Sequence, residues 1–427
     1  MEIVGILAAF FLFLVIGMPV MHAMGLVSLS VLGGHIQQMV IVTSRMFTTL
    51  DNYIFLSIPL FIFASELMTQ CDLMEALVRF CQAFIGHLKG GLALVNVLGS
   101  MLFAGVSGSA SADTAGLGRV EIALMTKAGY DRTYATTVTV ASSILGPIIP
   151  PSNIFIIYAA CTGSVSIAAM FLAGIMPGIL LGLVQMFLCY YYAVKNNHPV
   201  SPKTTLKEKL RATFEALPVL VLPIIILGGI VSGVFTATES AAIAVFYALI
   251  IAIFRNKLTL KILYNCCLRA AKMTCNVMLI IAVAALMGYA LTLLRLPQMA
   301  IEWVTEYINN KYLFLLFVNV LLLMIGLVLD QAPALLLVAP ILIPIANKFM
   351  INPIHFGLIV CFNLTVGLIT PPVGMQLFVG ANVGQVKLVA LYKSILPFAV
   401  VSIIALLLIT YFPWFTTFLP RLAGYIR

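Results

Sequence analysis

The 427-residue chain contains the same unusual motif twice, 221 residues apart. Residues 146–160 read GPIIPPSNIFIIYAA, and residues 367–381 read GLITPPVGMQLFVGA. Each motif places two adjacent prolines inside an apolar run, where each proline removes a backbone donor and clashes with the preceding helical turn. A membrane protein tolerates such a break only where the freed carbonyl groups face protein or a water-filled site. Two breaks at matching positions are typical of the binding site of a secondary transporter.

Composition indicates a polytopic membrane protein, because 63% of the residues are hydrophobic and only 9% are charged. The net charge of +9 does not indicate nucleic-acid binding, since the basic residues lie in loops between apolar segments and are explained by orientation and anionic lipid. There is no phosphate-binding loop, no C-x-x-C pair and no pair of histidines four residues apart. We therefore expect neither ATP nor a transition metal as a cofactor.

The repeat extends over both halves, since VNVL occurs at residues 95–98 and again at 318–321. Each half is predicted to contain the same elements in the same order. They are two helices with a glycine-containing break (5–32 and 216–254), a polar, partly amphipathic stretch (33–50 and 255–272), a span (53–69 and 275–294), a long apolar run with a polar centre (88–127 and 313–349), a Pro-Pro-broken helix (131–163 and 355–385) and a final span (169–194 and 394–412). We divide the chain into a first repeat (1–194), a cytoplasmic linker (195–215) and a second repeat (216–427).

The runs with polar centres are predicted to be re-entrant helical hairpins, because a simple span would leave those polar groups in lipid. Each half then crosses the membrane five times, so the two repeats are inverted relative to each other. With the N-terminus in the periplasm, 17 of the 23 Lys and Arg residues fall on the cytoplasmic side and 6 on the other. This asymmetry supports the predicted orientation in a bacterial inner membrane.

The tip of the first hairpin, VSGSASADTAGLG at 106–118, is rich in small residues and hydroxyls. Sodium prefers several oxygen ligands, many of them carbonyls, and the first Pro-Pro break is predicted to lie opposite this tip. In the alternative interpretation the small residues only let helices pack closely. The predicted ligands of a first sodium ion are Ser107, Ser109, Asp113, Pro150 and Asn153.

The second hairpin carries Asp330 in a markedly apolar stretch. A carboxylate at such depth costs on the order of 3 kcal/mol unless it faces a cavity or a partner, so we predict a site there; the alternatives are a structural ion pair or a helix cap. Glu239, in TATESAA, is instead predicted to cap a helix start. The predicted ligands of a second sodium ion are Gly326, Asn363, Gly367, Thr370, Pro371, Gly374 and Met375.

Five motifs together resemble the large membrane subunit of tripartite ATP-independent periplasmic (TRAP) transporters. They are FAGVSGSASADTAGLG (103–118), GPIIPPSN (146–153), GVFTATESAAIAVFYAL (233–249), GLVLDQAPALLLVAPILIP (326–344) and GLITPPVG (367–374). The resemblance implies an elevator, in which a transport domain with two hairpins moves against a scaffold. It also implies sodium coupling, a separate small four-helix membrane subunit and a soluble periplasmic substrate-binding protein.

Within that family the cargoes are organic acids, including C4-dicarboxylates and sialic acids, and a close match to its sialic-acid transporters implies sialic acid here. In that interpretation Ser107, Ser109 and Ser152 donate to the single carboxylate of the cargo, and Asp330 accepts hydrogen bonds from sugar hydroxyls while repelling a second carboxylate. The alternatives are an importer of C4-dicarboxylates or of another sugar acid, a stand-alone ion-coupled carrier, and a channel. An intramembrane enzyme is not predicted, because the acids are dispersed and have no basic partner at fixed spacing.

Overall fold

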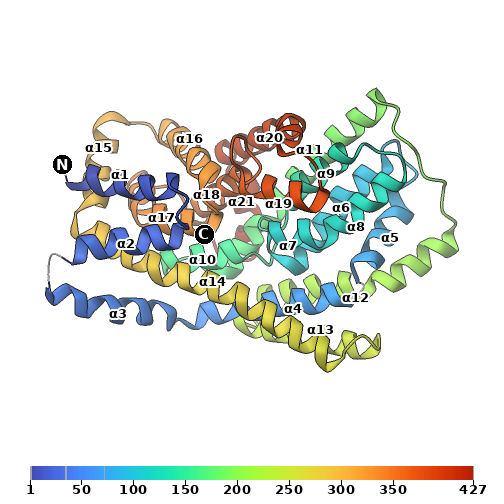
Figure 1. The fold of residues 1–427 in the computed structure, drawn as a ribbon, viewed down its shortest axis with the longest axis horizontal. Coiled ribbons are helices and arrows are strands. Elements are labelled where there is room, and N and C mark those ends of the chain that lie inside the picture. The colour runs from blue at the N-terminus through green and yellow to red at the C-terminus, as the bar shows by residue number, and fades with distance from the viewer. Residues whose placement is uncertain (1, 34–35, 72, 427) are drawn as a thin grey trace.

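The computed structural model describes residues 2–33, 36–71 and 73–426, and all regular elements in these ranges are helices. Eight of the described helices are long and apolar enough to cross a membrane, and four shorter apolar helices accompany them. The predicted all-α, multi-span architecture is confirmed. The helices form two groups, which we name the long-helix group and the tip group (Figure 1).

The long-helix group combines the beginnings of the two halves and runs along the lower edge of the molecule in Figure 1. Of its helices, α3, α4, α13 and α14 lie along that edge, whereas α1 lies higher in the view. In this group α13 packs on α4, and α14 packs against α2, α3 and α4. Its members are α1 (Glu2–Val15), α2 (Val20–Leu32), α3 (Ile36–Leu50), the 3-10 helix η1 (Tyr53–Leu56), α4 (Ser57–Gln70), α12 (Leu206–Val231), α13 (Ala237–Phe254) and α14 (Leu260–Leu293).

The tip group contains the later parts of both halves. Two further helices, α5 (Leu73–Ile85) and α15 (Leu296–Tyr307), lead into its two parts. Its members from the first half are α6 (Gly91–Ser107), α7 (Ala110–Ala115), α8 (Leu117–Lys127), α9 (Arg132–Ser143), α10 (Asn153–Thr162) and α11 (Ile167–Lys195). Those from the second half are α16 (Lys311–Val328), α17 (Gln331–Lys348), α18 (Pro353–Gly367), α19 (Met375–Gly384), α20 (Leu388–Tyr411) and α21 (Trp414–Leu422).

Local signals explain where several helices begin. The break between α12 and α13 contains Gly233, whose φ of 72° suits glycine. At the start of α13, the Thr236 hydroxyl accepts from the Glu239 backbone N–H, and the Glu239 carboxylate accepts from the Thr236 backbone N–H. This capping box confirms the predicted role of Glu239. The same motif at Thr205 and Glu208 starts α12.

Two element boundaries differ from the prediction. The segments predicted as a polar stretch and a separate span at 255–272 and 275–294 form one 34-residue helix, α14. Their counterpart in the first half is interrupted after α3, where the Asn52 side chain accepts from the Ile54 N–H. α14 also contains Asn265 and Asn276, but neither side chain accepts a backbone N–H as Asn52 does, and the helix continues through both. In addition, α12 begins at Leu206, so the polar stretch 195–215 is divided between a loop and the first turns of a helix.

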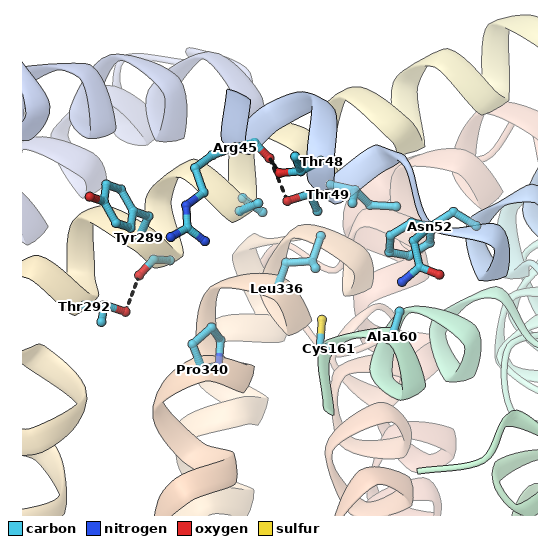
Figure 2. A pocket seen from close by; sticks show the side chains of 15 residues that line it. Arg45, Thr48, Thr49, Asn52, Ala160, Cys161, Tyr289, Thr292, Leu336 and Pro340 are labelled. Carbon is cyan, nitrogen blue, oxygen red and sulfur yellow. Dashed lines mark hydrogen bonds between the residues drawn. The ribbon is translucent and has the colours of Figure 1, made fainter. Parts of the chain in front are cut away.

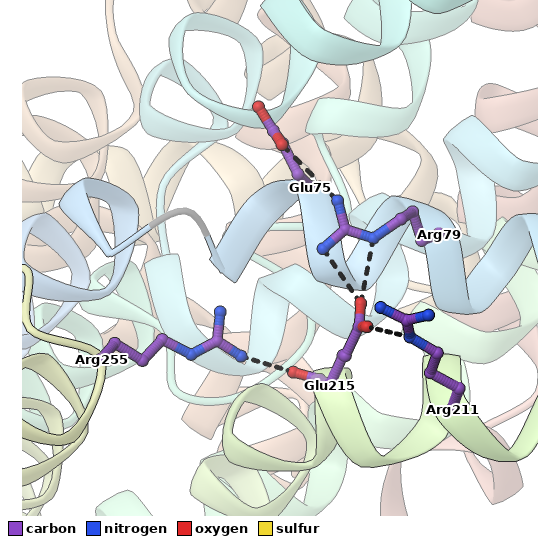
Figure 3. Close-up of polar contacts among 5 residues, drawn as sticks. All are labelled: Glu75, Arg79, Arg211, Glu215 and Arg255. Atoms are coloured by element: carbon purple, nitrogen blue, oxygen red, sulfur yellow. Dashed lines mark hydrogen bonds and ion pairs between the residues drawn. The ribbon is translucent and has the colours of Figure 1, made fainter.

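An ion-pair cluster connects α5 to α12 at the end of the molecule that carries the linker (Figure 3). The Arg79 guanidinium lies 3.2 Å from the Glu215 carboxylate, and Arg211 approaches the same carboxylate at 3.0 Å. Arg255 donates to the Glu215 backbone carbonyl at 2.7 Å. Such exposed pairs each add about 1 kcal/mol or less to stability, so their main effect is to fix the position of α5.

The linker also packs on the tip group. The His198 ring lies against Tyr130 and Tyr134, with ring centroids 4.8 and 4.9 Å away, and the Tyr130 hydroxyl donates to the Pro199 carbonyl at 3.2 Å. Partial burial between these rings lowers the pKa of His198 below its usual value. The linker is therefore held by specific contacts where it leaves α11.

Candidate functional site

The first polar tip packs directly on the first Pro-Pro break. The tip turns at Gly108, whose φ of 59° favours glycine, and Ser109 then caps α7 by accepting from the Ala112 N–H. A methyl group built on Gly108 lies 2.6 Å from the Pro151 carbonyl oxygen, and one built on Gly146 lies 3.1 Å from the Ser109 carbonyl oxygen. Only glycine lets the two backbones approach this closely.

The second polar tip meets the second break in the same way. A methyl group built on Gly367 lies 2.7 Å from the Gly326 Cα, so the two glycines are in backbone contact. Beyond the break, the Gly374 N–H donates to the Leu327 carbonyl at 3.0 Å. Both predicted pairs of tip and break are therefore present as neighbours.

Buried asparagines confirm that the two halves are built alike. Asn96, from the first VNVL, accepts a hydrogen bond from the Ser142 hydroxyl at 2.9 Å. Asn319, from the second VNVL, accepts from the Asn363 amide at 2.9 Å. Asn96 and Asn319 are 223 residues apart, and Ser142 and Asn363 are 221 apart, so residues at matching positions make similar contacts between α6 and α9 and between α16 and α18.

Gln376 joins the two halves at their tips, and sequence reasoning missed it. Its amide nitrogen donates to the Ala110 carbonyl at 2.9 Å and to the Thr114 hydroxyl, and its amide oxygen accepts from the Ser111 hydroxyl at 3.2 Å. Contacts therefore run without interruption from the second tip through Gly374 and Gln376 to the first tip. The one sequence signal was a polar amide directly after the second break.

The residues predicted for the first sodium ion divide into two places. The Ser107 hydroxyl is buried and has no hydrogen-bond partner among the described residues. The Pro150 carbonyl accepts no hydrogen bond within the described ranges either, and Asn153 begins α10 just beyond it. Asp113 lies apart from this group, because its carboxyl faces Ser100 on α6 and Glu121 on α8.

Ser109 and Ser152, which were also predicted to contact the cargo, both stand at this tip and break. The Ser109 hydroxyl accepts from the α7 backbone. The Ser152 hydroxyl is buried and donates to the Pro147 carbonyl. Each hydroxyl is thus already engaged in one local hydrogen bond, and Ser107 alone of these three keeps its hydroxyl free of described partners.

The residues predicted for the second sodium ion surround the second break. The Thr370 hydroxyl donates to the Val366 carbonyl at 2.9 Å. The backbone carbonyls of Thr370 and Pro371 accept no hydrogen bond from a described residue. The Asn363 amide is used to hold Asn319, but its oxygen has no partner in the described part of the chain. Met375 begins α19, and its side chain is 46% exposed.

Asp330 stands at the turn of the second hairpin. One of its carboxylate oxygens accepts from the Gln331 N–H at 2.9 Å and caps α17, which is the helix-cap role left open above. The residue is exposed at the protein surface, and no ion pair with a described residue involves it. The carboxylate therefore remains available to a solute.

The oxygens at both breaks suit a hard cation. Free carbonyls, an unpartnered buried hydroxyl and an amide oxygen are the ligand types that sodium and other hard cations prefer. A break in a helix also directs the N-terminal end of its second half toward the site, which favours an anionic group of a solute. The arrangement can therefore hold both a cation and an anion near the two tips.

Comparison with known proteins decides the family. The family model described as "Tripartite ATP-independent periplasmic transporter, DctM component" matches residues 7–415. The chain belongs to this family. It is thus a permease of a tripartite transporter and a multi-pass membrane protein, and the resemblance seen in the sequence is confirmed.

Individual DctM relatives match along nearly their whole length. The chain is 39% identical to the C4-dicarboxylate TRAP transporter large permease protein DctM of Pseudomonas aeruginosa, over 89% of each chain. It is 37% identical to the sialic acid TRAP transporter large permease protein SiaM of Vibrio cholerae, over 88% of each. The uncharacterized protein YgiK of Salmonella typhimurium is 38% identical, over 98% of this chain and 97% of that protein.

The fold also resembles a solved transporter outside this family. The YdaH transporter of Alcanivorax borkumensis matches with a TM-score of 0.65, over 88% of this chain and 87% of that chain. Its sequence identity is only 13%, so the likeness concerns the fold alone.

Proposed function

We propose that this permease imports an organic acid by sodium-coupled secondary active transport, with a periplasmic binding protein that delivers the cargo and a small membrane subunit as partners. The observation that carries the proposal is the continuous set of contacts from the second tip through Gly374 and Gln376 to the first tip. Two oxygen-rich breaks and two polar tips thereby converge on one place.

Sodium coupling follows from what the tips contain. A cation bound between a tip and its break adds a further link between these two segments, and it neutralises part of the charge that the cargo meets at Asp330. A coupled ion can drive transport only by binding the loaded state more tightly than the empty one. We infer that sodium orders the tips, and that the tip group then moves against the long-helix group as an elevator.

We propose sialic acid as the cargo, with a C4-dicarboxylate or another sugar acid as the alternative. Relatives carry both names, so the choice rests on Asp330. Its exposed carboxylate repels a second carboxylate on a bound solute but accepts hydrogen bonds from hydroxyls. A cargo with one carboxylate and several hydroxyls suits this tip better than a dicarboxylate.

The test is uptake by proteoliposomes that contain the permease, its small subunit and the binding protein. We expect uptake of N-acetylneuraminate to need sodium outside and to rise when the interior is made electrically negative. An uptake rate in potassium alone that equals the rate in sodium rejects the proposed sodium coupling. Uptake of succinate with no uptake of N-acetylneuraminate rejects the proposed cargo, and uptake by the permease alone rejects the need for partners.

A further inference from the structure

A cavity of about 520 Å³ lies between the long-helix group and the tip group (Figure 2). One wall comes from α3, the following turn and α14, and the other from α10 and α17. Its lining includes Arg45, Thr49, Asn52 and Tyr289 on the first wall and Leu336 and Pro340 on the second. None of its described lining residues is an acid.

Arg45 is the unusual member of this cavity. Its side chain points into the space shown in Figure 2, and its guanidinium carbon lies 4.8 Å from the centre of the Tyr289 ring. Arg79 and Arg269 are instead paired with the carboxylates of Glu215 and Glu66. No described carboxylate pairs with Arg45. A cation beside the last turns of a membrane-spanning helix is costly unless water or an anion solvates it.

The polar groups around Arg45 complete a donor-rich wall. The Asn52 oxygen accepts from the Ile54 N–H, which leaves its amide hydrogens for a ligand. The Tyr289 hydroxyl has no hydrogen bond with a described residue. Thr49 donates to the Arg45 carbonyl at 2.8 Å, so its hydroxyl can still accept. With an apolar wall opposite, the cavity suits a small organic anion that carries hydroxyls or an apolar body.

The cavity also lies on the way to the tips. Leu336 follows Asp330 by six residues of α17, which is about 9 Å of helix. Ala160 follows Asn153 by seven residues of α10, or about 10 Å. A solute in this cavity is thus one to two helical turns from both predicted binding elements.

We propose that this cavity is an entry site, in which Arg45 binds the carboxylate of the organic acid before the acid reaches the hairpin tips. The inference rests on the proposed function for the identity of the anion. It assigns Arg45 and Asn52 as binding residues outside the tip region, and Tyr289 as the ring that positions the guanidinium. A phosphate of a lipid headgroup offers the same chemistry, so the test separates the two sources.

Cys161 provides a built-in reporter, because it lines the cavity and is exposed. The other exposed cysteines, Cys267 and Cys275, are replaced by serine. The rate of modification of Cys161 is then measured with an anionic and with a cationic methanethiosulfonate reagent, in the complex with the small subunit. Both reagents react with the same thiolate, so the ratio of their rates reports the local potential and not the thiolate fraction.

We expect the ratio of anionic to cationic rates to fall roughly fivefold in Arg45→Gln, the effect of removing one nearby charge under partial screening. Arg45→Lys keeps the ratio. Arg295→Gln, which removes a charge from an exposed residue just beyond α14 outside the cavity, changes it far less. An unchanged ratio in Arg45→Gln, or an equal fall in Arg295→Gln, overturns the proposal.

Two further readouts identify the ligand. N-acetylneuraminate or succinate protects Cys161 from both reagents, whereas the uncharged sugar N-acetylmannosamine does not. In uptake, Arg45→Gln raises KM about tenfold, the loss of one charge-assisted hydrogen bond, with kcat little changed. Effects that appear only when the liposomes contain phosphatidylglycerol assign the cavity to lipid and reject the entry site.

The outcomes also separate this proposal from the proposed function. If the wild-type complex shows no sodium-driven uptake, the proposed function fails, and the labelling ratio then reports only an anion site of another kind. If wild-type uptake is normal while Arg45→Gln changes neither KM nor the labelling ratio, the entry site alone is rejected.

Discussion

Asp330 has two carboxylate oxygens, and the start of α17 uses one of them. The other tip is similar, because the Ser109 hydroxyl caps α7 while the Ser107 hydroxyl has no hydrogen-bond partner among the described residues. Because the capping bonds fix the backbone of each turn, the remaining polar atoms are held in place before a solute arrives. Such preorganisation lowers the ordering cost of binding. Structural and binding roles are thus shared by neighbouring atoms of the same short turns.

These two roles of Asp330 can be separated by substitution. Asn is as good a cap as Asp, so Asp330→Asn keeps the start of α17, whereas Asp330→Ala loses about 1 kcal/mol of stability with the cap. We expect both variants to abolish uptake, because both lose the carboxylate. Uptake in proteoliposomes and thermal unfolding in detergent measure the two effects. Wild-type uptake by Asp330→Asn shows that the charge is not needed for the cargo.

At the scale of elements, each hairpin is placed by glycines that allow backbone contact with its broken helix. Gly326 against Gly367 is one such contact. Gly367→Ala places a methyl group 2.7 Å from the Gly326 Cα, so the second hairpin must shift. Overpacking of this kind costs about 1–3 kcal/mol.

Gly228→Ala is the matched control, since Gly228 lies inside α12 and nothing is within 4 Å of a methyl group built there. Alanine stabilises a helix by about 1 kcal/mol relative to glycine. We expect Gly228→Ala to keep both uptake and thermal stability, and Gly367→Ala to lower both. Equal behaviour of the two variants means that the contact between hairpin and break does not position the site.

The order of the elements could be predicted from the sequence because its signals are local. Each Pro-Pro pair, each polar centre in an apolar run and each VNVL identifies one segment. Because each signal occurs twice, the sequence also predicts which segments of the two halves correspond. The role of Gln376 could not be predicted, because its partner Ala110 is 266 residues away. The continuity of α14 could not be predicted either, because it contains Asn265 and Asn276, and only the structure shows that these do not interrupt the helix as Asn52 interrupts the first half. The cavity at Arg45 exists only because α3, α10, α14 and α17 meet.

At the scale of the whole molecule, the two helix groups meet along α14 and α17. The tips, the breaks and the predicted cation ligands all lie in the tip group. The Arg79–Glu215 cluster instead holds α5 to α12 at the edge of the long-helix group (Figure 3). An elevator requires the tip group to slide as a body, so movement must occur at the surface between α14 and α17, and also where α6 packs on α4 and α12.

A disulfide between α14 and α17 therefore tests the elevator. A methyl group built on Gly288 of α14 lies 3.7 Å from Cγ of Pro340 on α17, so the two positions are in side-chain contact, as a cross-link between them requires. We expect oxidised Gly288→Cys/Pro340→Cys protein, in a background without Cys161, Cys267 and Cys275, to lose uptake and to recover it on reduction. The control pair is Gly25→Cys/Val283→Cys, where a methyl group built on Gly25 of α2 lies 3.6 Å from Cγ1 of Val283 on α14.

The control joins two helices of the same group, so its oxidised form keeps uptake if only the relative motion of the groups matters. Mass spectrometry of the cross-linked peptides gives the extent of oxidation in each pair. Full uptake by completely cross-linked Gly288→Cys/Pro340→Cys protein shows that α14 and α17 do not separate during transport. The cargo must then pass between static groups, and the movement must be confined to the hairpin tips.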